Sequence, residues 1–388
     1  MNSRTTHWIE WTEQHALAVG ATSLLLCAIA GIFPTMRPQF FNAWLFAWLF
    51  WLGISLGGMA LTMMHHLTGG DWGVLIRPIT TSAARTLPVL FVLFLPILLG
   101  MSILFPWARP DELARDPILR HVHSYLNAQL FFIRYLIYFI IWIGLAFGLT
   151  HSKNAGMLRR ISAGGLVIYV VLISLAGVDW IMSRQAHWSS SIFGFILAVS
   201  QSLTALCFAI VVLWSRAERP TIARFAKSKH FIDLGNLLLM FIILWAYMNF
   251  AQYLITWTGN ELPDIGWYVQ RTYGGWRFVA GVIIFIHFLV PFFLLLSRAL
   301  KQDINRLGML CAALLFLRIL DLYWNIGPQV QSDPHGGFVL SPLDLLAWLG
   351  IGGVWYAAFS YFLKNAPLLA PPSGDDGSTY GASEPQSA

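Results

Sequence analysis

Several ionisable side chains stand inside long apolar runs of the sequence or at their edges. They are His65, His66, Arg134, Asp179, His287, Arg318, Asp321 and Asp344. Ionisable groups are costly in a membrane and usually functional there. Histidine exchanges protons near neutral pH, and a carboxylate shielded by aromatic residues can accept a proton. These residues are therefore our candidates for a proton path or for binding a polar headgroup.

His287 is the most deeply placed of them. It lies about eleven residues into an apolar run, roughly 16 Å deep and close to the bilayer centre. This depth suits a quinone headgroup, a proton relay or a haem, and the structural alternative is an imidazole bonded to a neighbouring helix. A b-type haem normally needs a second histidine at the same depth, whereas His65 and His66 close their run near a membrane surface. A di-haem cytochrome b is therefore disfavoured.

The charged candidates also have structural interpretations. Arg318 and Asp321 are three residues apart on one helix face, which predicts that they neutralise each other. Arg134 is expected to pair with Asp179, to hold a quinone carbonyl or to snorkel. Asp179 ends its apolar run, so it is either a proton acceptor or part of a cap or loop ion pair.

The composition sets the class of protein. Hydrophobic residues make up 57% of the 388 residues and charged residues 11%, and the mean hydropathy is +0.65. This is more apolar surface than a soluble core can bury, so lipid is the expected solvent. The formal charge of +6 does not indicate nucleic acid, because the basic residues are spread over short loops. The three cysteines stand singly, so we expect no metal site and no covalently bound cofactor in this chain.

Ten apolar runs are long enough to cross a bilayer, and backbone amides in hydrocarbon must bond within a helix. The sequence therefore predicts an all-α polytopic membrane protein, with the first run a span rather than a cleaved signal. The predicted spans are 15–33, 43–65, 84–105, 126–149, 161–182, 192–214, 234–257, 276–298, 306–325 and 342–363.

Basic residues predict the orientation, because they are retained in cytoplasmic loops. Fifteen Lys and Arg fall on the side of the two termini and seven on the other side, so both termini are expected in the cytoplasm. The longer loops 106–125, 183–191, 258–275 and 326–341 then face the periplasm. Tryptophans in or near them suit either an aromatic belt or partner docking. The transmembrane domain is expected to cover 1–365, and the polar stretch 366–388 is expected to be a disordered cytoplasmic tail.

Three stretches carry a resemblance to a known family. They are GVDWIMSRQAHWSSSIFG at 177–194, DLGN at 233–236 and AYMNFAQYLITWTGNELPDIGWYVQR at 246–271. The chain resembles, over about residues 40–325, the second quinone-binding-type membrane subunit of alternative complex III, within the NrfD-like or polysulfide-reductase membrane superfamily. The most specific part is the W-x-G-N…W-Y-x-x-R loop.

The resemblance implies a fold of two four-helix bundles, at about 43–182 and 192–325, with peripheral helices at 15–33 and 342–363. It implies a subunit without redox centres in a bacterial inner-membrane quinol:cytochrome c, or other acceptor, oxidoreductase. Menaquinol or ubiquinol would be the substrate, and the subunit would support its oxidation and proton translocation. The implied partners are a paralogous NrfD-like subunit, an iron–sulfur subunit, multihaem and monohaem cytochrome c subunits that hold the haems c, and a terminal oxidase.

The same resemblance makes the polar and aromatic loop residues candidates for docking these partners. They are Trp188, Asn260, Glu261, Asp264, Trp267, Tyr268 and Arg271. The sequence departs from the family pattern at GNELPDIGWY, where a more acidic stretch precedes the Trp-Tyr pair in the family. This departure leaves the roles of Glu261 and Asp264 open. The alternative function is a secondary transporter or another polytopic scaffold, although a transporter usually has a charged midplane site between matched broken helices.

Overall fold

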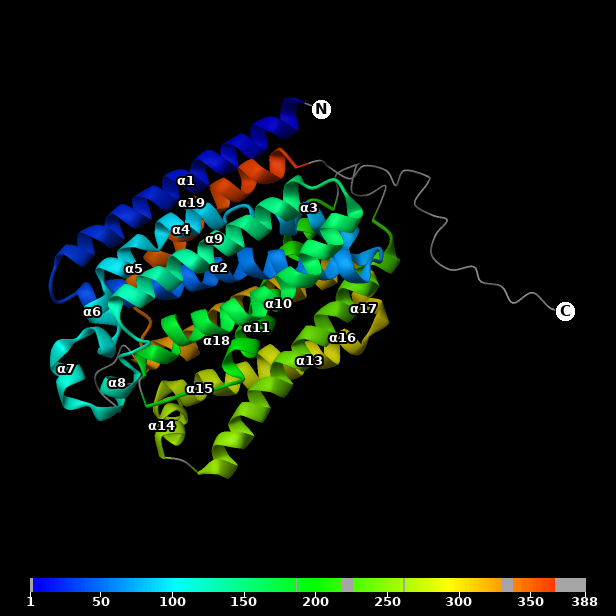
Figure 1. Ribbon diagram of the computed structural model, residues 1–388. Coiled ribbons are helices and arrows are strands. Elements are labelled where there is room, and N and C mark those ends of the chain that lie inside the picture. Colours follow the sequence, from blue (N-terminus) through cyan, green and yellow to red (C-terminus); the bar gives the residue numbers. More distant parts are fainter. Residues whose placement is uncertain (1–2, 186, 218–225, 261, 330–337, 367–388) are drawn as a thin grey trace.

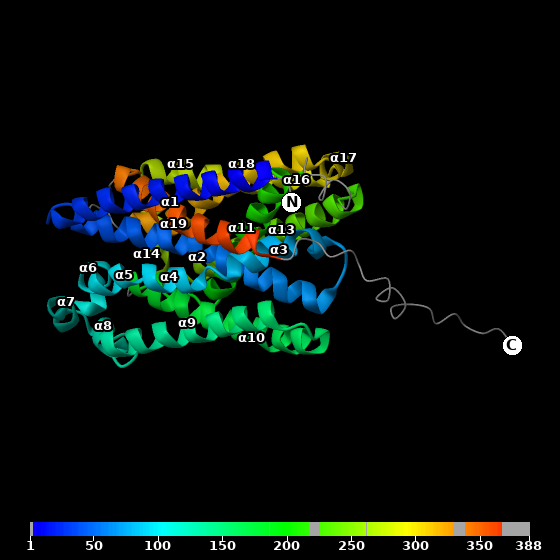
Figure 2. The same cartoon turned by 90° about the horizontal axis from the view of Figure 1, so that it is seen from above.

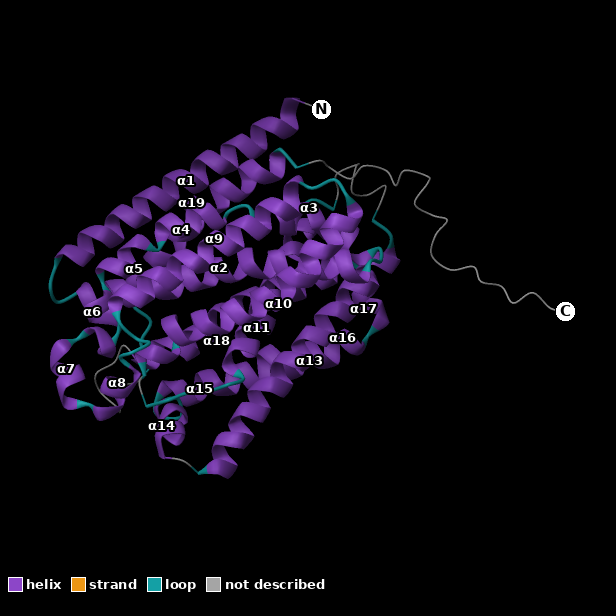
Figure 3. Cartoon of the chain, in the orientation of Figure 1, coloured by secondary structure: helices purple, strands orange, loops and turns teal. Residues whose placement is uncertain are grey.

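Helices make up nearly all of the chain in the computed structural model, which describes residues 3–185, 187–217, 226–260, 262–329 and 338–366. No strand occurs within these ranges (Figure 3). Ten helical segments are long and apolar enough to cross a membrane, which confirms the predicted all-α polytopic membrane protein. They are Gln14–Ile32, Arg37–Thr68, Trp72–Leu99, Ala128–His151, Ala155–Arg184, Phe193–Trp214, Ser228–Gly259, Gly275–Leu296, Ile304–Ile326 and Pro342–Lys364.

We divide the eight spans between the first and the last, in chain order, into a first and a second bundle of four, and we call the contact between them the seam. One group holds α2 (Arg37–Thr68), the segmented third span, α9 (Ala128–His151) and α10 (Ala155–Trp180). The other holds α11 (Phe193–Trp214), α13 (Ser228–Gly259), the eighth span and α18 (Ile304–Ile326). Helices α2 and α10 pack on α11 at the seam. Figure 2 shows α9 and α10 on the opposite side of α2 from α18.

Two further helices lie outside the bundles. Helix α1 (Ser3–Ile32) packs mainly against α19 (Pro342–Lys364), and α19 packs in turn against α2. Only 17% of the first span is buried, so most of its surface is left for lipid. The three short helices α7 (Pro110–Arg115), α8 (Pro117–Val122) and α14 (Leu262–Gln270) lie at one end of the molecule, which we call the loop end (Figure 1).

Helix α2 is the core of the fold. It is apolar on every side, the pattern of a helix surrounded by protein, and its most apolar window is fully buried. It contacts helices of both bundles as well as α1 and α19. The position of α2 therefore fixes where the other spans lie.

The third span was expected at 84–105, and the structure shows that this prediction was wrong. The span covers Trp72–Leu99 and consists of α3 (Trp72–Ala84), α4 (Leu87–Leu93) and α5 (Leu95–Leu99), while Met101–Leu104 is a separate short helix, α6. Two arginines, Arg77 and Arg85, and Pro78 made the first half resemble a loop. Pro78 is in fact accommodated inside α3.

Side chains satisfy the carbonyl groups at the breaks of this span. The indole N–H groups of Trp48 and Trp44 donate to the carbonyls of Leu90 and Leu93, each at 2.8 Å. The hydroxyl of Tyr135 donates to the carbonyl of Phe91 at 2.6 Å. Proline lacks the N–H that a helix needs, and a free carbonyl in hydrocarbon is costly. These aromatic donors therefore make the segmented span tolerable in the membrane.

Glycines permit the closest contact at the seam. A Cβ atom on Gly57 would lie 2.1 Å from the carbonyl oxygen of Gln201 in α11, so no larger residue fits there without movement. Gly58 and Gly165 also face close neighbours, whereas Gly164 has open space around it. Of the pairs Gly57-Gly58 and Gly164-Gly165, only the first is a packing contact at both positions.

We predict that Gly57→Ala lowers the stability of the chain by about 1–3 kcal/mol, because the added methyl group forces α2 and α11 apart. Gly164→Ala is the matched control and is expected to leave stability unchanged or slightly raised, since alanine favours helix. Thermal unfolding of the purified chain in detergent measures both. Equal melting of the two variants would contradict the close approach at the seam.

Candidate functional site

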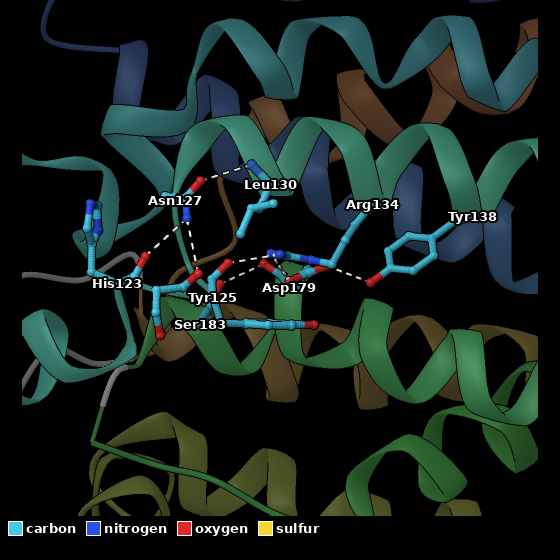
Figure 4. A network of polar contacts seen from close by, with 9 residues as sticks. His123, Tyr125, Asn127, Leu130, Arg134, Tyr138, Asp179 and Ser183 are labelled. Atoms are coloured by element: carbon cyan, nitrogen blue, oxygen red, sulfur yellow. Dashed lines mark hydrogen bonds and ion pairs between the residues drawn. The ribbon is translucent and has the colours of Figure 1, made fainter.

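An ion pair joins the third and fourth spans of the first bundle near the loop end (Figure 4). Arg134 of α9 donates to both carboxylate oxygens of Asp179 in α10, at 2.9 Å from Nε to Oδ2 and 2.8 Å from Nη2 to Oδ1. The hydroxyl of Tyr138 donates to Oδ2 at 2.7 Å. The predicted pairing of Arg134 with Asp179 is therefore present, in the strong bidentate form.

Neighbouring residues hold this pair in place. Asn127 caps α9 by accepting the N–H of Leu130 at 2.9 Å, which places Arg134 in the second turn. The third guanidinium nitrogen, Nη1, donates to the carbonyl of Tyr125 at 2.8 Å, and the guanidinium stands 3.9 Å above the Tyr125 ring. The arginine is thus bound on all sides and does not snorkel.

A second ion pair lies in the second bundle, on α18. Arg318 Nη1 is 2.7 Å from Asp321 Oδ2, and Arg318 Nε donates to the hydroxyl of Thr204 in α11 at 3.2 Å. Both side chains are almost wholly buried. The predicted neutralisation on one helix face is therefore present, with an added bond to the neighbouring helix.

His287 occupies an irregular segment of the eighth span. The span consists of α15 (Gly275–Val282), a π-helical segment Ile283–Leu289 and α16 (Val290–Leu296). His287 is 0% exposed, and its ring lies 4.5 Å from that of Trp245 in α13. Neither ring nitrogen has a hydrogen-bond partner among the described residues, so the structural alternative of a bonded imidazole is not what the structure has. π-Helical segments often mark functional sites.

The two histidines of α2 lie far along the chain from these clusters, at the end opposite to the loop end. His65 Nε2 is 3.0 Å from the carbonyl oxygen of Gly70, and His66 Nδ1 is 3.1 Å from the hydroxyl of Ser162. An ion pair between Asp71 and Lys229, at 3.2 Å, joins the two bundles beside them. His65 and His66, which are adjacent in α2, therefore lie apart from the two ion pairs and from His287.

Much of the predicted docking loop is turned inward. Trp188 and Trp267 are buried and stack on each other at 4.7 Å. Asn260 is exposed and ends α13 in the left-handed conformation, with φ of 51°, which asparagine adopts more readily than most residues. Asp264 and Tyr268 are partly buried, and Glu261 lies outside the described residues.

Buried arginines cap the end of α18. Arg271 is 0% exposed and donates to the carbonyls of Trp324 at 3.0 Å and Asn325 at 2.7 Å. Arg184 donates to the next carbonyl, that of Ile326, at 3.4 Å. The last carbonyls of a helix lack partners and carry partial negative charge, so two guanidinium groups suit this position. Arg271 therefore orders the loop from inside.

The tryptophans near the predicted surfaces do not form an aromatic belt. Trp180, Trp188, Trp267 and Trp276 are at most 4% exposed, and only Trp257, at 67%, stands at the surface. The tryptophan content of the loops does not distinguish an aromatic belt from a packed loop, because both structures are rich in tryptophan.

Sequence reasoning missed three contributors to these sites. Tyr138 and Thr204 bond to the two ion pairs, and Arg184 caps α18. Tyrosine and threonine in apolar runs carry no distinctive signal, and Arg184 was counted only as a loop charge. Asp344 is explained by capping: it accepts the N–H of Ser341 at 2.9 Å and the hydroxyl of Tyr323 at 3.1 Å.

Comparison with known proteins gives no family. No protein-family model matches the sequence, and no curated protein matches it. Within the described residues no group of three or more His, Cys, Asp or Glu is placed to hold a metal ion. The architecture of a multi-pass helical membrane protein is established, and the resemblance to alternative complex III stays a prediction.

We predict that the Arg134–Asp179 pair acts as one unit. Asp179→Ala alone is expected to cost about 3–5 kcal/mol, because it leaves a largely buried guanidinium without its charge partner. The double variant Arg134→Met with Asp179→Leu should cost less than the sum of the single changes. Thermal unfolding of the four proteins in a double-mutant cycle measures this coupling, and additive costs would show that the pair contributes nothing.

We predict that Arg271→Lys loosens the loop end, because lysine cannot direct planar, forked donors at several carbonyls. Limited proteolysis of the purified chain should then cut near α14 and the end of α18 faster than in the parent protein. Arg277→Lys, at an exposed position nearby, is the control and should change nothing. Equal cleavage of both variants would mean that the cap of α18 does not hold the loop.

Proposed function

We propose that this chain is a membrane subunit of a respiratory quinol:electron-acceptor oxidoreductase of the alternative complex III type. The stretches 177–194, 233–236 and 246–271 support this through their resemblance to the second quinone-binding-type subunit. The packing of α1 against α19, with α19 against α2, supports the peripheral position that the resemblance implies for the first and last spans. The chain itself contributes no redox centre.

The observation that carries the proposal is the matched placement of two buried carboxylates. Asp179 and Asp321 each lie near the loop end of the fourth helix of a bundle, and each is paired with an arginine. Quinol oxidation releases protons together with electrons, so a subunit beside a quinol site needs carboxylates that can take part in moving protons. His287 adds a titratable group at greater depth.

The proposal places the chain in a bacterial cytoplasmic membrane with both termini in the cytoplasm. The loop end then faces the periplasm, where an iron–sulfur subunit and the multihaem and monohaem cytochrome c subunits would receive the electrons. A paralogous NrfD-like subunit would lie beside the chain in the lipid, and a terminal oxidase would extend the assembly. Menaquinol or ubiquinol would be the electron donor.

The geometry gives less support to a secondary transporter. Inverted-repeat transporters break corresponding helices in their two halves. Here the segmented span Trp72–Leu99 is the second of its bundle, whereas the span with the π-helical segment, Gly275–Leu296, is the third. The irregular helices thus do not correspond.

Affinity purification of the tagged chain from its native membrane in mild detergent tests the proposal. Subunit identification should reveal an iron–sulfur protein and cytochromes, and the reduced-minus-oxidised spectrum should show c-type haem. A mock purification from untagged membranes is the control. A solitary, colourless protein would refute the respiratory proposal and make transport the hypothesis to test.

We predict that His287→Ala and Asp179→Asn each slow quinol oxidation by the assembled complex by about a hundredfold or more, the low end for loss of a proton-transfer group. Both variants should still co-purify with the partner subunits, because asparagine keeps polar contacts to Arg134 and alanine leaves no new polar group. His151→Ala, at an exposed position of α9, is the control. Unchanged turnover in both variants would leave the two residues with structural roles only.

A further inference from the structure

A small cavity lies at the seam, where α2 and α10 of one bundle meet α11 and α18 of the other. Its volume is about 40 Å³. One wall is apolar and includes Leu49, Phe50 and Trp180, and the other carries Ser200, Gln201, Thr204 and Arg318. The cavity therefore brings polar groups of α11 and α18 against apolar residues of α2 and α10.

The polar wall is tied to a titratable group in each bundle. Gln201 Oε1 accepts a hydrogen bond from the hydroxyl of Tyr169 in α10 at 2.8 Å. Thr204 accepts from Arg318, which is ion-paired with Asp321. Hydrogen bonds thus run from each bundle to the rim of the cavity.

Arg318 is incompletely bonded for a buried cation. It is 4% exposed, and its Nη1, although close to Asp321, makes no aligned hydrogen bond among the described residues. Trp245 Nε1 and both ring nitrogens of His287 are also buried without a hydrogen bond in the described part of the chain, but neither residue lines the cavity. An unmet donor in such a place costs about 1–3 kcal/mol, and more for a charged group. Of these residues, Arg318 is the one that lines the cavity, and a polar molecule there would complete its hydrogen bonding.

We propose that this cavity is a binding site for a small cluster of water molecules held by Arg318, Gln201 and Thr204. A cavity needs at least about 10–15 Å³ to hold a water molecule, so this one is large enough for water. It is too small for a quinone ring. Dry cavities in proteins are lined by apolar groups, whereas a guanidinium, an amide and two hydroxyls line this one.

The water cluster completes a polar connection across the seam between Tyr169 of the first bundle and the Arg318–Asp321 pair of the second. The Tyr169–Gln201 hydrogen bond crosses from α10 to α11, and the water joins Gln201 to the Thr204–Arg318 hydrogen bond. This inference concerns only residues of this chain and does not rest on the respiratory proposal.

Hydroxyl-radical footprinting of the full chain in lipid nanodiscs tests the site, because radicals formed from bound water oxidise the side chains beside it. Trp180, which lines the cavity, should be oxidised although it is 1% exposed. Trp142 and Trp355 are 0% exposed, do not line the cavity and should stay unmodified. Protection of Trp180 equal to that of these two tryptophans would show a dry cavity and overturn the proposal.

A filling variant separates bound water from general solvent leakage. Ser200→Val places two methyl groups in the cavity and should abolish the oxidation of Trp180. Leu197→Met, a substitution on the cavity wall that nearly conserves the side-chain volume, should leave the oxidation of Trp180 unchanged. If Ser200→Val fails to fold, Gly53→Ala takes its place, since its Cβ would lie 3.4 Å from the Gln201 side chain in ordinary contact. Oxidation of Trp180 that persists in the folded filling variant would contradict the site.

Discussion

The need to satisfy every backbone carbonyl inside a membrane governs this structure. The third span is interrupted, and the indoles of Trp44 and Trp48 together with the Tyr135 hydroxyl donate to carbonyls at its breaks. Two of these three donors come from α2, so the central helix and the broken span depend on each other. At the loop end, Arg184 and Arg271 perform the same task for the last turn of α18.

The same constraint explains where charge is allowed. Each buried aspartate of the two bundles is held by an arginine, and a hydroxyl completes each cluster: Tyr138 bonds to Asp179, and Thr204 bonds to Arg318. A buried ion pair is stable only when hydrogen bonds compensate the lost hydration. The first pair meets this condition fully among the described residues. The second, next to His287 and the seam, meets it less completely.

Much of the fold follows from sequence because hydropathy acts locally. Nine of the ten spans lie close to their predicted positions, since an uninterrupted apolar run of sufficient length has to be a helix in lipid. The third span was misplaced because Arg77, Pro78 and Arg85 interrupt its run. In the structure α3, α4 and α5 follow one another as a single span, and they pack against α2.

The sequence by itself determined the class of protein, the number of spans and the pairing of Arg318 with Asp321, which lie on one helix face. Only the tertiary structure decided that Arg134 binds Asp179 in another helix, and that Trp188, Trp267 and Arg271 point inward. It alone revealed the π-helical segment at His287 and the cavity at the seam. The physical reason is that burial in lipid depends on composition along the chain, whereas partners for polar groups come from helices that are distant in sequence.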